Sequence, residues 1–122
     1  TNTLIDHGIN SVGIMSNDTN DYPEDSFENM GKTAKKNKFS FPYLYDETQE
    51  IAKKYGAVCT PDFFGYNASL ELQYRGRLDA TRMSITSDDL EPELLNAMIE
   101  ISQTGQGPDV QNPSVGCSIK WK

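Results

Sequence analysis

Hydrophobic positions recur along the chain with two periods, and their order predicts an α/β protein. Alternating apolar and polar residues predict short strands at 9–15 and 41–45, then a pair of strands at 62–66 and 70–75. Helical spacing predicts the end of a helix at 3–8, a second helix at 23–36, a third ending at Gly56 and a fourth near residues 90–101. This order predicts parallel crossovers followed by one hairpin.

Two of these helices carry signals at their ends. Pro23 suits a first helical turn, and Glu24 and Asp25 favour the positive end of the helix dipole. Asp46 and Gln49 have the spacing of a capping box that would open the third helix. We expect that helix to turn three side chains inward, those of Ile51, Ala52 and Tyr55.

The second half of the chain carries the clearest helical stripe, which consists of Leu90, Leu94, Leu95, Met98, Ile99 and Ile101. If that helix begins at Asp88, Pro92 costs it one backbone hydrogen bond. In the hairpin, the alternation predicts one buried face, formed by Leu70, Leu72 and Tyr74. We expect Arg75 and Arg77 to pair with Asp79 or with the acidic start of the last helix. The chain from Gln103 onward predicts an irregular tail.

Composition narrows the possible functions. The 122 residues carry a net charge of -7, which argues against nucleic acid as a partner because phosphate binding needs a basic face. No apolar run approaches the ~20 residues of a membrane span. Two cysteines are too few for a secreted disulfide scaffold, so we expect a cytoplasmic protein. The sequence has no glycine-rich phosphate loop and no metal-ligand set, and we expect no cofactor.

Four separated motifs, in this order, carry a family resemblance that spans nearly the whole chain. They are YPEDS at 22–26, FPYLYDETQE at 41–50, GAVCTP at 56–61 and GCSIKW at 116–121. The chain resembles thioredoxin-like, peroxiredoxin-related proteins of the alkyl hydroperoxide reductase/thiol-specific antioxidant group. The resemblance implies a thioredoxin-like sheet with flanking helices. It also implies that Thr60 and Pro61 form a cis peptide that faces the family's redox cysteine.

The same resemblance predicts that part of the fold is absent. The family's first strand and its cysteine motif would precede the helix that ends near Gly8. That strand would lie between the strands at 12–15 and 62–66, so its absence leaves two sheet edges unpaired. The chain is then a fragment, re-pairs its own strands, or assembles with another chain. We favour a homodimer, or another partner chain, that covers the edges.

Cys59 is the candidate redox residue, since the resemblance places it beside the cis-proline. As a catalytic residue it would need a lowered pKa, and no cation lies within four residues of it in the sequence. The alternative is a small apolar loop residue. Cys117 is a second thiol. A Cys59–Cys117 disulfide is possible only if the two Cα atoms lie roughly 4.4–6.8 Å apart.

These observations give one domain and two functional hypotheses. Residues 1–104 are expected to form an N-terminally truncated thioredoxin-like domain, and residues 105–122 an irregular tail packed on it. The favoured hypothesis is a folded binding or assembly module without full redox activity on its own. The alternative is a thiol–disulfide oxidoreductase or thiol peroxidase that uses Cys59, with Thr60 and Pro61 binding the substrate peptide.

Overall fold

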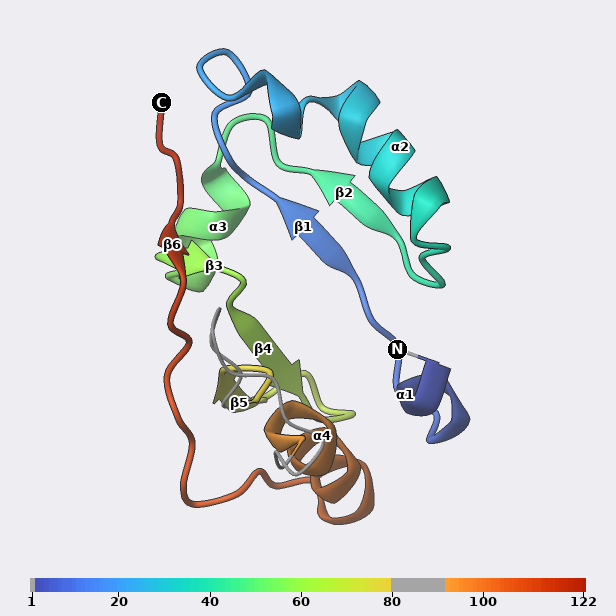
Figure 1. Cartoon of the computed structure of the whole chain (residues 1–122). Coiled ribbons are helices and arrows are strands. Elements are labelled where there is room, and N and C mark those ends of the chain that lie inside the picture. The colour runs from blue at the N-terminus through green and yellow to red at the C-terminus, as the bar shows by residue number, and fades with distance from the viewer. Residues whose placement is uncertain (1, 80–91) are drawn as a thin grey trace. The chain divides into compact units, whose positions relative to one another are not determined.

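The computed structural model describes residues 2–79 and 92–122, which divide into two compact units. The first unit consists chiefly of Asn10–Val58 and Ser118–Lys122, and the second of Thr3–Ile9 and the described part of Cys59–Cys117. The helices are α1 (Asn2–Asp6), α2 (Phe27–Lys36), α3 (Glu50–Tyr55) and α4 (Glu93–Thr104), with a 3-10 helix at Pro23–Asp25 (Figure 1). The strands are β1 (Gly13–Met15), β2 (Tyr43–Tyr45), β3 (Cys59–Thr60), β4 (Phe63–Tyr66), β5 (Leu72–Gly76) and β6 (Cys117–Ser118).

In the first unit, β1 and β2 form a parallel pair covered by α2 (Figure 1). The pair confirms the predicted crossover, although both strands are shorter than the alternation predicts. Their register places Ile14 opposite Leu44. Both side chains lie on a face that stays 40% and 52% exposed, whereas Met15 is buried. The aromatic residues before β2 pack on one another, with the Phe39 ring stacked on the Phe41 ring at a centroid distance of 4.6 Å.

The second helix begins later than predicted. Pro23 opens the 3-10 turn, and α2 itself begins at Phe27. The oxygen of the Ser26 side chain accepts a hydrogen bond from Asn29 N–H at 3.2 Å, so serine is the N-cap. A serine hydroxyl can satisfy an N–H of the first helical turn and proline cannot.

The predicted capping box at Asp46 and Gln49 is wrong. Gln49 is the N-cap of α3 in a left-handed conformation and makes no side-chain cap bond. Asp46 does the capping from further away, because its carboxylate accepts from Ile51 N–H at 3.3 Å and from Ala52 N–H at 2.9 Å. The helix ends at Gly56 as predicted, with a φ of 72° that favours glycine. Of the three expected inward residues only Ala52 is buried.

Gln49 instead links three segments of the first unit. Its amide donates to Ser16 O at 2.8 Å and to Lys120 O at 2.9 Å, while its oxygen accepts from Lys122 N–H at 3.1 Å. Gln49 is 2% exposed, and the three partners of its side chain are all backbone atoms. A buried amide with satisfied hydrogen bonds therefore fixes the last residues of the chain beside α3.

In the second unit, β4 and β5 form the predicted antiparallel hairpin, with an irregularity between Gly65 and Tyr66. Tyr74 is 2% exposed and packs with Ala97, Met98 and Ile101 of α4. The predicted buried face is wrong at its other two positions. Leu70 has a φ of 60° in the turn and is 83% exposed, and Leu72 is 49% exposed.

The last helix matches the predicted stripe where it is described. α4 has Pro92 as its N-cap and buries Ala97, Met98 and Ile101. The expected start at Asp88 and the stripe position Leu90 lie outside the described residues. The tail after Gly105 is irregular as predicted, apart from β6.

The tail closes the outer edge of β5 with a side chain. The Gln111 amide donates to Gln73 O at 2.8 Å, and its oxygen accepts from Arg75 N–H at 3.0 Å. Arg77 N–H donates to Asn112 O at 3.0 Å. An unpaired strand edge is thereby satisfied without a further strand.

Replacing Asp46 should destabilise the first unit in a pH-dependent way. Burial alone would raise the pKa of Asp46, but hydrogen bonds from Ala52 N–H, from the Ser16 hydroxyl and from two other N–H groups lower it below its usual range. The stabilisation is therefore present above the unfolded-state pKa of about 3.9 and is lost as the pH falls below it. We expect Asp46→Asn to lower the free energy of unfolding by about 1–3 kcal/mol at neutral pH.

Urea unfolding of wild type and variant at pH 7 and at pH 3 measures this effect. Asp21→Asn is the matched control, because Asp21 is exposed. A variant as stable as wild type at pH 7, or one whose deficit is unchanged at pH 3, would contradict the capping role.

Candidate functional site

The predicted site residues lie at the start of the second unit's strands. Cys59 and Thr60 form β3, and the Thr60–Pro61 peptide bond is cis. Thr60 and Pro61 are exposed, and Cys59 is half-buried. The loop therefore presents its threonine and proline to solvent and turns its thiol inward.

The Cys59 thiol faces the tail. Its sulfur donates a hydrogen bond to Ser114 O at 3.7 Å, and Ser114 follows it by more than fifty residues in the sequence. The Ser114 hydroxyl lies 2.9 Å from Asp62 Oδ1 and 2.6 Å from Gly76 O. Asp62 is 6% exposed on its side chain and pairs with Arg75 at 3.5 Å. A carboxylate and a guanidinium thus flank the thiol together.

This environment favours the protonated thiol. Burial and the negative charge of Asp62 raise the pKa of Cys59, and the positive charge of Arg75 opposes them only in part. The reactive form of cysteine is the thiolate, and a raised pKa makes it rarer at neutral pH.

Cys117 lies in β6, the strand that pairs with β3. Thr60 Oγ1 donates to Cys117 O at 3.3 Å, which brings β3 against β6. Neighbouring residues of a strand point to opposite faces, so Cys59 points away from the face of Thr60. Both cysteines are free in the structure, and Cys117 is exposed. The disulfide left open by the sequence is absent here.

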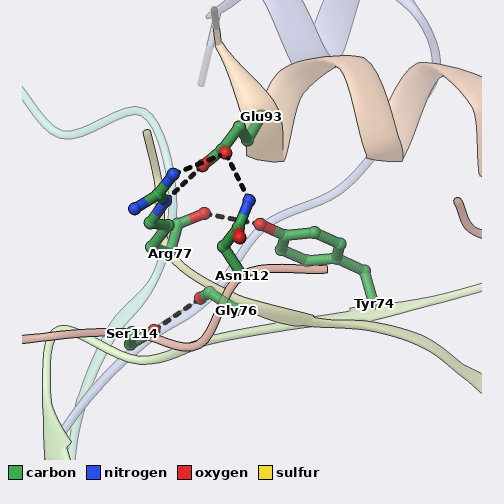
Figure 2. Close-up of polar contacts among 6 residues, drawn as sticks. All are labelled: Tyr74, Gly76, Arg77, Glu93, Asn112 and Ser114. Atoms are coloured by element: carbon green, nitrogen blue, oxygen red, sulfur yellow. Dashed lines mark hydrogen bonds and ion pairs between the residues drawn. The ribbon is translucent and has the colours of Figure 1, made fainter. Parts of the chain in front are cut away.

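An ion pair between Arg77 and Glu93 contacts the tail at Asn112 (Figure 2). Arg77 donates from Nε to Glu93 Oε2 and from Nη2 to Glu93 Oε1 at 2.9 Å. Asn112 Nδ2 donates to the same Oε1 at 2.7 Å, and Tyr74 donates to Arg77 O at 2.6 Å. The hydrogen bond with Arg77 lowers the pKa of Glu93 despite the burial that opposes it. The expected pairing of Arg77 with the last helix is confirmed, whereas Arg75 pairs with Asp62.

A pocket of about 290 Å³ lies in the same unit but does not include the loop. It is lined by α4, from Glu93 to Glu100, and by the tail from Pro108 to Asn112. Glu93 is paired with Arg77, and the pocket has a second carboxylate in Glu100. Within residues 2–79 and 92–122, no group of three His, Cys, Asp or Glu side chains could hold a metal ion. No helix of that part of the chain is long and apolar enough to cross a membrane.

The helices, the parallel pair and the hairpin define a thioredoxin-like α/β protein. The chain matches the AhpC/TSA family over residues 2–81 and belongs to that family. No curated protein matches it.

Two crystal structures have the same fold over nearly the whole chain. One is an uncharacterized conserved protein from Geobacillus kaustophilus, with a TM-score of 0.89 and 46% identity, and the other a hypothetical protein from Sinorhizobium meliloti 1021, with a TM-score of 0.88 and 37% identity. Each match covers 99% of this chain. The chain spans 64% and 66% of the length of these two proteins.

Sequence reasoning found the loop but missed most of what surrounds it. The search for a cation within four residues of Cys59 overlooked Arg75, which reaches the thiol's surroundings across the hairpin. Asp62, three residues from Cys59, is a local source of negative charge that opposes ionisation of the thiol. Ser114 carries no motif at all, so only the path of the tail could have revealed it.

Removing the charge of Asp62 should make Cys59 more reactive. Asp62→Asn deletes a negative charge that raises the pKa of the thiol and leaves Arg75 without its carboxylate partner. We therefore expect the pKa of Cys59 to fall and its alkylation by iodoacetamide at neutral pH to become faster. The pH dependence of the alkylation rate measures the change in the pKa of Cys59. Peptide mass spectrometry identifies Cys59 as the residue that is alkylated.

Asp109→Asn is the matched control, since Asp109 is exposed in the tail. An unchanged pH profile for Asp62→Asn would mean that Asp62 does not set the ionisation of Cys59.

Proposed function

We propose that this chain is a folded binding module of a thioredoxin-like protein, and that its Cys59-Thr60-Pro61 loop binds a segment of polypeptide. On this proposal the 122 residues do not carry full redox activity by themselves. The observation that supports it most directly is the state of Cys59, whose thiol donates to Ser114 O beside a buried carboxylate. Such a thiol is held in place, and the exposed Thr60 and Pro61 remain for contact with a partner.

The alternative function is that of a thiol–disulfide oxidoreductase or thiol peroxidase with Cys59 as the nucleophile. Membership of the AhpC/TSA family and the positive charge of Arg75 favour it. Arg75, however, is 44% exposed and shares its charge with Asp62, so the activation it offers is small. For that reason we rank the binding function first.

Assays of the isolated chain separate the two functions. We expect it to leave the rate of insulin reduction by dithiothreitol unchanged and to show no turnover of hydrogen peroxide, because its thiol is mostly protonated. Cys59→Ser should then change neither result. Turnover that Cys59→Ser abolishes and the matched Cys117→Ser leaves intact would establish the enzyme and exclude the binding module.

We propose further that the first unit assembles with a second copy of the chain along β1. Within the described residues β1 pairs with β2 alone, so one of its edges can accept another strand. The neighbouring face adds an apolar contact, because Val12 is 54%, Ile14 40% and Leu44 52% exposed. Unpaired edges with apolar faces favour association between chains.

A charge on this face should prevent the assembly. We expect wild type to elute as a dimer in size-exclusion chromatography with light scattering, and Ile14→Lys to elute as a monomer, because a lysine in the interface would lose its hydration. Leu70→Lys is the control, since Leu70 is 83% exposed in the hairpin turn. A monomeric wild type, or an Ile14→Lys variant that dimerises like the control, would contradict the proposal.

A further inference from the structure

The C-terminal segment Ser114–Cys117, here called the strap, lies directly on the Cys59-Thr60-Pro61 loop. Ser114 contributes its carbonyl to the Cys59 thiol, and Cys117 contributes its carbonyl to Thr60 Oγ1. Both acceptors are backbone atoms. The loop therefore contacts the strap through groups that any extended segment of polypeptide would present.

Gly116 sets the one side-chain requirement of this contact. A Cβ atom at position 116 would lie 2.3 Å from Thr60 O and 3.1 Å from Thr60 C. Real Cβ atoms essentially never approach backbone closer than 3.0 Å, and neither backbone can give way like the end of a flexible side chain. Only glycine allows so close an approach. The loop thus selects a segment with glycine opposite the Thr60 carbonyl.

The strap contributes little to the apolar core. Val115 is 88% exposed, and both Gly116 and Cys117 are exposed. Its polar anchor is the Ser114 hydroxyl, which lies against Asp62 Oδ1 and Gly76 O. Because displacement of the strap would expose little apolar surface, it would cost little hydrophobic free energy.

We propose that the loop binds extended segments that carry a glycine opposite Thr60, and that the strap occupies this site until such a segment displaces it. The inference rests on the proposed binding function and names the class of partner that the loop takes. The residue after glycine is recognised by its carbonyl, so its side chain is free to vary. The strap and the partner compete for the Cys59 thiol and the Thr60 hydroxyl of the loop.

Opening of the strap can be read from Cys59. In a Cys117→Ser background Cys59 is the only thiol. There we expect Gly116→Ala to make the alkylation of Cys59 by iodoacetamide, measured on the native protein, about tenfold faster. This factor corresponds to about 1.4 kcal/mol in the equilibrium between closed and open strap. Gly31→Ala is the matched control, because a Cβ there meets nothing within 4 Å. Equal alkylation rates in the two variants would overturn the strap.

A second variant guards against a folding defect. Thr60→Val keeps the shape of the side chain and removes the hydrogen bond to Cys117 O. We expect it also to speed alkylation of Cys59, with the same circular dichroism and the same urea midpoint as the Cys117→Ser parent. Faster alkylation that appears only together with a lowered urea midpoint would indicate unfolding and overturn the proposal.

Binding in trans tests the partner class. Fluorescein-labelled peptides would be Ser-Val-Gly-Cys-Ser, which copies residues 114–118, and versions with alanine for glycine or with serine for cysteine. Binding is measured by fluorescence anisotropy. We expect the copied peptide and its serine version to bind the Gly116→Ala protein at least tenfold more tightly than they bind the wild-type protein, because the strap of the variant has left the site. The peptide with alanine in place of glycine should bind neither the wild-type protein nor the Gly116→Ala protein.

The outcomes separate the two proposals. Equal affinity of the peptides for wild type and Gly116→Ala would overturn the strap and leave the binding function standing. No binding of any peptide to either protein, together with faster alkylation in Gly116→Ala, would overturn the binding function and with it the partner class. Binding of the alanine version would overturn the glycine requirement.

Discussion

The carboxylate of Glu93 is the contact on which the second unit depends. It accepts hydrogen bonds from Nε and Nη2 of Arg77, the residue after β5, and from the side-chain amide of Asn112 in the tail. Glu93 itself is in the first turn of α4. With side-chain exposures of 28% for Arg77 and 19% for Glu93, the pair is shielded enough to be stronger than a surface ion pair. Strand, helix and tail are therefore fixed to one another by a single side chain (Figure 2).

The position of the tail then determines the chemistry of the loop. Asn112 is only two residues from Ser114, whose carbonyl accepts the Cys59 thiol and whose hydroxyl meets Asp62. A shift of the tail would remove the acceptor from the thiol and expose the carboxylate to water. The raised pKa of Cys59 thus has two sources, burial of the thiol beside the tail and the negative charge of Asp62, which lies three residues away in the sequence.

Sequence predicts the features of this protein that arise from neighbouring residues. Gly56 ends its helix as predicted because a left-handed residue there needs no distant partner. Asp46 and Gln49 mislead because their partners, Ser16 and Lys120, lie about 30 and 70 positions away, and long-range bonds override the capping spacing. Leu70 and Leu72 fit the alternation of apolar and polar residues along the predicted strand. Both are nevertheless exposed, because Leu70 lies in the turn and α4 does not cover Leu72. The same holds for the candidate site. The sequence predicts Cys59, Thr60 and Pro61 as site residues, whereas it does not predict Ser114 or Arg75, which are distant from the loop in the sequence.

The unusual feature of the loop is that its closest neighbour is the chain itself. A loop that is open to a partner should have unsatisfied polar groups, but the Thr60 hydroxyl and the Cys59 thiol both donate to carbonyl oxygens of the strap. Polar groups that are paired within the molecule gain little from pairing with another, so only a segment with the same backbone geometry can replace the strap at small cost. The close approach of Gly116 adds a steric limit to that geometry, because it excludes every residue with a Cβ. The geometry of the loop is therefore matched to the main chain of the strap, by two carbonyl acceptors and by the close approach of Gly116 to the Thr60 carbonyl. The tail that completes the fold also covers the loop that we propose as a binding site.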